Sequence, residues 1–173
     1  MAAKELLVDP SQFDFDHPLA DIEAIRELNR QRFEMEQLTA IVAIQPETGI
    51  CVGYKDVSDS EFWVRGHMPG MPLMPGVVML EAVAQQCSYH ATRENLVGDG
   101  VVVGFGGVEH ARFRGPVRPG ERLILITKMV KVRPRRMIVC DFQGIVGEKV
   151  VVEGTIRGIA LPMDSLSSPS ETA

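Results

Sequence analysis

Long apolar runs, paired cysteines and an apolar leader are all missing from this sequence. No run of apolar residues approaches the roughly 18–20 residues that a membrane-crossing helix needs, so we expect no transmembrane segment. Residues 1–10 contain one lysine and no apolar core, which argues against a secretory signal. The three cysteines, Cys51, Cys87 and Cys140, are an odd number without paired spacing. These absences exclude a disulfide framework and a zinc ribbon, and they predict a cytoplasmic protein kept in reducing conditions.

Extended disorder and a second large domain are not indicated either. The chain has 173 residues, of which 45% are hydrophobic and 24% charged, as in ordinary globular proteins. A chain of this size buries enough surface to fold without a disulfide or a structural metal. We expect three parts: a helical extension over residues 1–34, one folded domain over 35–162 and a serine-rich disordered tail over 163–173.

Aromatic residues make up only 6% of the chain, and this affects how its one strongly basic stretch is interpreted. The net charge is −5, yet residues 110–136 hold nine basic residues and one acidic residue. Nucleic-acid binding is one interpretation, but the stretch offers little aromatic surface for stacking bases. A docking face for an acidic protein or an anionic cofactor fits as well, and so does a set of solvated strand ends. The basic residues are Arg112, Arg114, Arg118, Arg122, Lys128, Lys131, Arg133, Arg135 and Arg136.

The spacing of apolar residues changes along the chain. Apolar residues at three-residue steps predict a helix over 18–32, which Asp16 would cap. Residues 76–95 are apolar on most sides and predict a long buried helix. Strand-like runs bounded by turn residues predict strands over 38–44, 50–57, 101–113, 122–132, 136–146 and 149–160; apolar and polar residues alternate over 38–44 and in part over 122–132. This order predicts an α+β fold in which one antiparallel sheet curls around the long helix.

One histidine lies in a segment whose backbone is held by many turn-forming residues. Residues Gly66–Val77 contain three prolines and three glycines. Catalytic groups often lie on loops that a scaffold holds in place, and histidine titrates near neutral pH. His67 is therefore a candidate general base. A lone histidine is more often a structural hydrogen-bonding residue, so that alternative stays open.

Three further candidates lie at the start of the long helix. Glu81 interrupts the apolar surface of this helix. It could be a carboxylic acid that is kept partly protonated and can donate a proton. Alternatively, it could lie on the one solvent-exposed face of the helix. Gln85 is four residues further on and therefore shares the face of Glu81. Gly76 opens the helix, where unpaired N–H groups could stabilise a carbonyl oxygen as it gains negative charge. A glycine also simply suits a helix start. Together, His67 as base, Glu81 as acid and the Gly76 N–H could remove a proton beside a carbonyl and expel a leaving group.

Two sequence motifs carry a resemblance to a known family. The string G-H-M-P-G-M-P-L-M-P-G-V-V-M-L-E-A-V-A-Q, Gly66 to Gln85, closely resembles the signature of the beta-hydroxyacyl-acyl-carrier-protein dehydratases of fatty-acid synthesis. The segment E-H-A-R-F-R-G-P-V-R-P-G-E, Glu109 to Glu121, resembles the second motif of that family. A weaker similarity begins at Asp56, and the resemblance as a whole runs from about residue 32 to residue 161.

The resemblance implies the hot-dog fold, with the long helix inside the sheet, and a homodimer or multimer of dimers whose active sites form at the interface. By position, it implies His67 as the catalytic histidine and Glu81 as the catalytic acid. Gly76 would bind the thioester carbonyl, and Gln85 would orient the acid. The substrate would be a 3-hydroxyacyl thioester carried on acyl carrier protein. No metal or redox cofactor is expected, and neither nucleic acid nor a membrane is an expected partner.

The sequence also departs from the family pattern, and two other functions stay open. Residues 29–34 do not match the usual N-terminal segment, an expected aspartate is absent from 38–44, and Met68 and Gly104 replace aromatic residues. One alternative is a hot-dog thioesterase that uses Glu81 to activate water, although this leaves His67 without a role. The other is a non-catalytic hot-dog subunit that only binds an acyl carrier or a catalytic partner.

Overall fold

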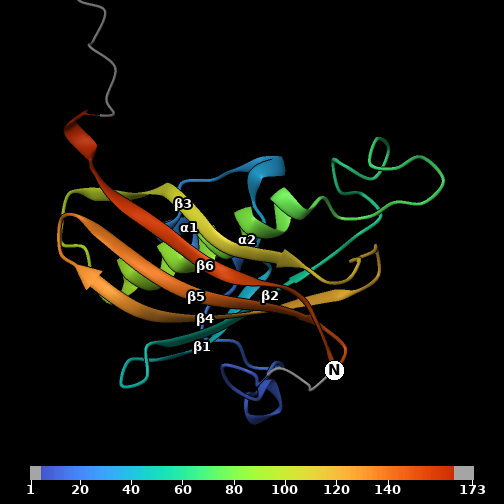
Figure 1. Cartoon of the computed structure of the whole chain (residues 1–173). Helices are drawn as coiled ribbons and strands as arrows, with labels where there is room; N and C mark the ends of the chain where they lie inside the picture. The colour runs from blue at the N-terminus through green and yellow to red at the C-terminus, as the bar shows by residue number, and fades with distance from the viewer. Residues whose placement is uncertain (1–4, 166–173) are drawn as a thin grey trace, which may run out of the picture.

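A computed structural model of the chain describes residues 5–165 (Figure 1). It contains two α-helices, one short and one long, six strands and a few single turns of 3-10 helix. In chain order the elements are η1 (Pro10–Gln12), α1 (Ile22–Leu28), η2 (Phe33–Met35), β1 (Ala40–Gln45), β2 (Ile50–Asp56), α2 (Gly76–Arg93), β3 (Val101–Phe113), β4 (Arg122–Arg133), β5 (Met137–Val146), β6 (Lys149–Pro162) and η3 (Met163–Ser165).

The strands form one antiparallel sheet in the order β1-β2-β4-β5-β6-β3. The sheet twists and curves around α2, which crosses its concave side (Figure 1). The outermost strands, β1 and β3, have only one neighbouring strand each. The predicted α+β architecture is therefore confirmed, and each predicted strand, like the long helix, begins and ends within two residues of its predicted limits.

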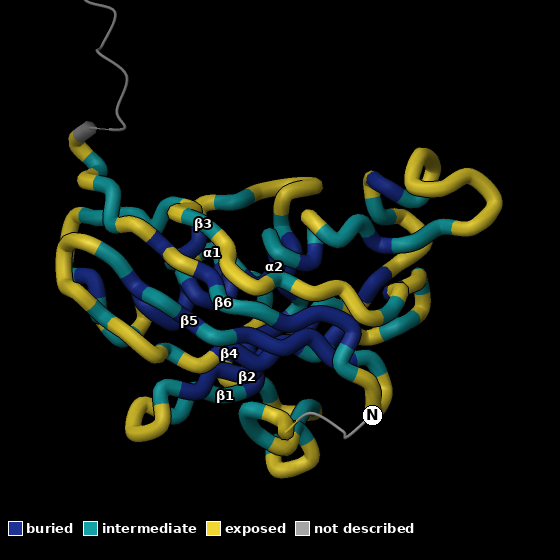
Figure 2. The backbone as a smooth tube through the Cα atoms, in the orientation of Figure 1, coloured by how far each residue is buried: buried dark blue, intermediate teal, exposed yellow. Residues whose placement is uncertain are grey.

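The hydrophobic core lies between α2 and the sheet. Buried side chains of α2, such as Ala82, Val83 and Tyr89, pack in one cluster with Leu125 and Ile138 of the sheet. Figure 2 shows burial concentrated in the middle of the strands and along α2, while the connections between elements are exposed. The core thus fixes α2 and leaves its first turns close to the surface.

A smaller apolar cluster lies on the other side of the sheet. Buried residues of β1, β2 and β4, including Val42, Val52 and Ile126, are packed there against Leu7 and Phe15 of the N-terminal segment. Figure 1 shows this segment folded beneath β1 and β2. The N-terminal residues therefore cover a sheet face that would otherwise be apolar and exposed.

The predicted helix over 18–32 is wrong in its start and its length. Helix α1 is confined to Ile22–Leu28, and its cap is Asp21, whose side chain accepts a hydrogen bond from the Ala24 N–H, rather than Asp16. The preceding residues are extended because Ala20 pairs with Ile41 of β1 through two main-chain hydrogen bonds. Sheet pairing therefore outcompetes the helical pattern in this segment.

The three-part division of the chain stays a prediction. Most of the predicted disordered tail, residues 166–173, lies outside the described residues, and its first residues form η3. Among the helices that the structure describes, none has both the length and the apolar surface to cross a bilayer.

Candidate active site

The loop between β2 and α2 carries His67 and projects from one end of the molecule (Figure 1). Two anchors hold the base of this loop. The His67 N–H donates to the Trp63 carbonyl at 2.7 Å, and the Trp63 side chain is buried. Lys55 of β2 pairs with Glu61 at 2.9 Å, with side-chain exposures of only 12% and 9%. The histidine itself is exposed, so a firmly held backbone presents it to the outside.

The ring of His67 has a defined orientation. Its Nδ1 lies 2.8 Å from the Leu73 carbonyl oxygen. A carbonyl can only accept a hydrogen bond, so Nδ1 carries the hydrogen. In the neutral ring, Nε2 then has a free lone pair that can take a proton. This tautomer is the one that a general base requires.

Glu81 and Gln85 meet on one face of α2, as their spacing predicts. Glu81 is half-buried, and its Oε1 accepts a hydrogen bond from Gln85 Nε2 at 2.8 Å. Gln85 is almost fully buried, and its Nε2 also donates to the Met35 carbonyl at 2.6 Å. Its Oε1 accepts from the Gln37 N–H at 2.9 Å. The carboxyl of Glu81 is thus oriented by a side chain that is itself fixed by the backbone.

Gly76 begins α2 directly after Pro75, at the end of the helix where N–H groups are unpaired and the helix dipole is positive. A Cβ at this position would lie only 2.7 Å from the ring of Phe113 on β3. Any side chain would therefore displace this ring. The close packing explains why a glycine occupies the first position of the helix, beyond its general suitability for helix starts.

His67 and Glu81 make no direct contact with each other in the part of the chain that the structure describes. Among residues 5–165, no hydrogen bond or ion pair connects His67 with Glu81. His67 lies on the projecting loop, whereas Glu81 lies in the second turn of α2. The two groups thus come from different elements of the fold.

Comparisons with known proteins identify the family. The FabA-like domain matches residues 29–155. The chain therefore belongs to the FabA-like family. The 3-hydroxyacyl-[acyl-carrier-protein] dehydratase FabZ of Desulfotalea psychrophila is 41% identical over 138 residues, 79% of this chain and 90% of that protein. FabZ of Fusobacterium nucleatum is 32% identical over 145 residues, 84% of this chain and 100% of that protein. The predicted dehydratase family is confirmed.

A solved structure agrees with the FabA-like assignment at the level of the fold. The dehydratase heterocomplex ApeI:P from Xenorhabdus doucetiae has a TM-score of 0.68, with 13% sequence identity, and covers 82% of this chain and 93% of its own. This likeness, together with the FabA-like match, confirms the hot-dog fold that the motif implied.

The sequence did not identify one part of this FabA-like site. Met35 and Gln37 hold Gln85 through their main-chain groups. Every residue type has the same main-chain groups, so these contacts could not be predicted from the sequence. The nearby residues 29–34 were notable only because they depart from the family pattern. Among the residues that the structure describes, no group of three or more histidine, cysteine, aspartate or glutamate side chains is placed to hold a metal ion.

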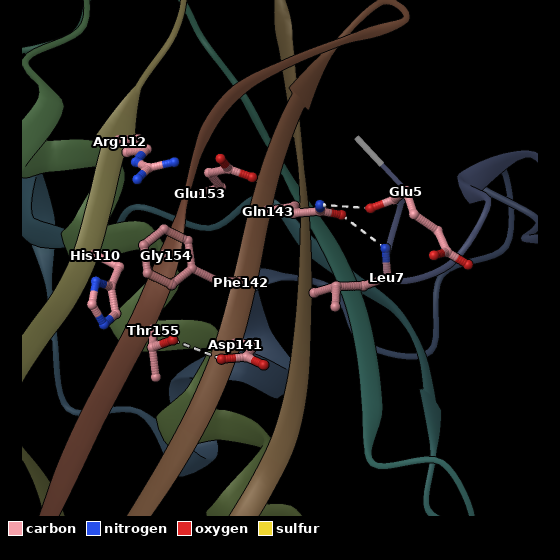
Figure 3. Close-up of a pocket in the computed structure, with 10 residues that line it drawn as sticks. All are labelled: Glu5, Leu7, His110, Arg112, Asp141, Phe142, Gln143, Glu153, Gly154 and Thr155. Atoms are coloured by element: carbon pink, nitrogen blue, oxygen red, sulfur yellow. Dashed lines mark hydrogen bonds between the residues drawn. The ribbon is translucent and has the colours of Figure 1, made fainter. Parts of the chain in front are cut away.

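A separate cavity of about 360 Å³ opens on the face of the sheet that points away from α2 (Figure 3). Its lining is mostly polar and includes His110, Arg112 and Asp141, which accepts a hydrogen bond from Thr155. Gln143 bonds there to the main chain of the N-terminal segment. None of the four candidate residues lines this cavity.

Proposed function

We propose that this chain removes water from a 3-hydroxyacyl thioester carried on acyl carrier protein, giving the trans-2-enoyl thioester. His67 is the base and Glu81 the acid. The observation that carries the proposal is the hydrogen bond from His67 Nδ1 to the Leu73 carbonyl, because it leaves Nε2 free to accept a proton. The family signature around these residues matches this chemistry.

The proposed reaction moves two protons. His67 Nε2 takes a proton from C2 of the substrate, and the electron pair moves toward the thioester carbonyl. The Gly76 N–H at the start of α2 stabilises the negative charge on that oxygen. The C3–O bond then breaks while Glu81 donates its proton to the departing hydroxyl, which leaves as water. Gln85 donates to Oε1 of Glu81, so Oε2 is the better position for the proton that is transferred.

We further propose that the active site forms between two copies of this chain. The edge strand β3 exposes Phe105, Val108 and Phe113, and the His67 loop exposes Met68 and Met71. Large exposed apolar groups next to an unpaired strand edge are typical of an interface. A second copy would cover this surface and bring its Glu81 to the His67 loop of the first. The lack of a hydrogen bond or ion pair between His67 and Glu81 within residues 5–165 is consistent with this arrangement.

The direct test is a spectrophotometric assay with 3-hydroxybutyryl and crotonyl thioesters. The proposed enzyme forms and consumes the conjugated enoyl group, so its absorbance changes without release of free thiol. Release of thiol from either substrate would identify a thioesterase. No change in absorbance and no thiol release would identify a non-catalytic subunit.

The carrier protein is proposed to dock on the turn between β4 and β5. Arg133, Arg135 and Arg136 are all exposed there. Two other arginines of the basic stretch are partnered: Arg114 pairs with the buried Glu153, and Arg122 pairs with Asp56. The turn is therefore the part of the stretch best able to attract an acidic carrier.

Reversing Arg133 and Arg136 to glutamate should weaken use of the carrier-linked substrate, most strongly at low salt. Charge at the rim of an interface governs the encounter rate, and salt screens it. Turnover of a small pantetheine-linked substrate should change little, and this substrate is the control. An equal loss on both substrates would show damage to the fold or site. Unchanged use of the carrier-linked substrate would place the docking face elsewhere.

The proposed location is the cytoplasm, where the relevant carrier substrates would be made. Cys51, Cys87 and Cys140 are free and buried, in keeping with a reducing compartment. Burial raises the pKa of the Cys51 thiol, so this group is poorly reactive.

A further inference from the structure

The position of Glu81 depends on the backbone of a segment far from it in sequence. Gln85 receives the Gln37 N–H at its Oε1 and donates from Nε2 to the Met35 carbonyl. An N–H can only donate and a carbonyl can only accept, so these two contacts fix which end of the amide is which. The second hydrogen on Nε2 then points to Glu81. A shift of the segment 35–37 would therefore move the hydrogen bond that orients the acid.

An ion pair holds this segment in place. Glu36 lies between the two residues that bind Gln85, and both of its carboxylate oxygens accept hydrogen bonds from Arg26 of α1. The distances are 2.7 Å from Nε to Oε1 and 2.7 Å from Nη2 to Oε2. The Glu36 side chain is only 15% exposed. The hydrogen bonds from Arg26 lower the pKa of the Glu36 carboxyl, so it is ionised at neutral pH.

The geometry distinguishes this pair from an ordinary surface salt bridge. A single exposed ion pair contributes little to stability. A bidentate arginine–carboxylate contact, by comparison, fixes both the distance and the relative orientation of the two side chains. Arg26 is itself held on the short helix α1, where its carbonyl accepts from Arg32 at 2.9 Å. At the end of the same helix, Asn29 Nδ2 donates to the Gln85 carbonyl at 3.0 Å. Helix α1 and the segment 35–37 thus brace Gln85 from two sides.

The space beside these residues is too small for a substrate. The cavity beside them, lined in part by Arg26, Asn29, Glu36 and Gln85, is about 10 Å³, enough for no more than one water molecule. Any effect of Arg26 or Glu36 on the reaction must therefore pass through the residues they hold.

We propose that Arg26 and Glu36 are positioning residues for the dehydration, acting through Gln85 on Glu81. This inference rests on the role proposed for Glu81. It gives a role to two residues that flank segment 29–34, where this chain departs from its family pattern. Their ion pair holds the backbone that positions the acid.

The test is the Glu36→Gln variant of the full chain, assayed with a 3-hydroxybutyryl thioester. Small displacements of catalytic groups cost up to about 10²-fold in rate, so we expect kcat to fall by about 10-fold with KM nearly unchanged. Glu23→Gln is the matched control. Glu23 is the other carboxylate that pairs with Arg26, but it is exposed and does not adjoin the segment 35–37. Its removal should leave kcat at the wild-type value.

A double-mutant cycle with Gln85→Leu tests the route of the effect. In a Gln85→Leu background, adding Glu36→Gln should cause no further loss of kcat, because the residue through which Glu36 acts is gone. A role in stability alone would instead lower the melting temperature and leave the kcat of the folded enzyme unchanged. Independent, multiplicative losses in the double variant would overturn the inference.

Arg26→Lys provides a second variant should Glu36→Gln fold poorly. Lysine keeps the positive charge but cannot make the bidentate contact with Glu36, so kcat should still fall. Wild-type kcat in either folded variant would overturn the inference. The outcome stays distinct from that for the proposed function: wild-type turnover in Glu81→Gln would remove the role of Glu81 itself, whereas a loss there with wild-type kcat in Glu36→Gln would remove only the positioning role.

Discussion

Turnover should fall by at least about 10²-fold in His67→Ala and, separately, in Glu81→Gln, since a positioned acid or base is worth roughly 10²–10⁴ in rate. His67→Ala removes the only group in the projecting loop whose free nitrogen can take the C2 proton. Glu81→Gln keeps the shape of the side chain and its contact with Gln85 but removes the proton that the hydroxyl needs. Initial rates with a 3-hydroxybutyryl thioester measure both effects.

Both losses should occur with the fold intact. His67 is exposed, so its removal leaves no cavity, and Glu81→Gln is nearly isosteric. Circular dichroism and melting temperature should match the wild type. His17→Ala and Glu47→Gln are suitable controls because both residues are exposed and outside the site. A variant of His67 or Glu81 that retained near wild-type turnover would refute the role assigned to that residue.

Mixing the two inactive variants should restore activity. If each site takes His67 from one copy and Glu81 from the other, a mixed dimer contains one intact site and one doubly defective site. Random exchange makes half of the dimers mixed, so activity should return to about one quarter of the wild-type value, as expected for a symmetric pair. The measurement is the dehydration rate after the two variants are unfolded and refolded together.

The control is each variant refolded alone, which should remain inactive. Sites contained within single chains would give no recovery on mixing, because every site would carry one defect. A monomer by light scattering at micromolar concentration, with activity retained, would contradict the shared site more directly. The exposed apolar groups of β3 make that outcome unexpected.

The sequence predicted the sheet and the long helix well because their signals are local. The strand-like runs of β3 through β6 are bounded by turn residues, and the apolar character of α2 follows from its burial. The same holds for the contact between Glu81 and Gln85, which the four-residue spacing of a helix places on one face. The dehydratase signature located all four candidate residues within one short stretch of chain.

The segment before β1 was predicted poorly because long-range contacts decide it. Ala20 is extended since it pairs with Ile41, a partner that the pattern around it does not reveal. Met35 and Gln37 contribute backbone groups to the site, and a backbone group is present at every position whatever the side chain. Nor could spacing show that Arg26 would reach Glu36, since the turn between them is irregular.

The apolar cluster on the outer side of the sheet bears on what counts as the minimal domain. Family similarity begins at residue 29, and a boundary drawn by homology would fall there. Apolar contacts extend further toward the N-terminus, because Leu7, Val8, Phe13 and Phe15 pack against the apolar cluster of β1, β2 and β4. A chain shortened to residues 29–155 would keep every candidate catalytic residue. It would also expose the apolar outer surface of β1, β2 and β4, and exposed apolar patches of this kind favour aggregation. The packed structure of this chain therefore includes residues that precede the family match.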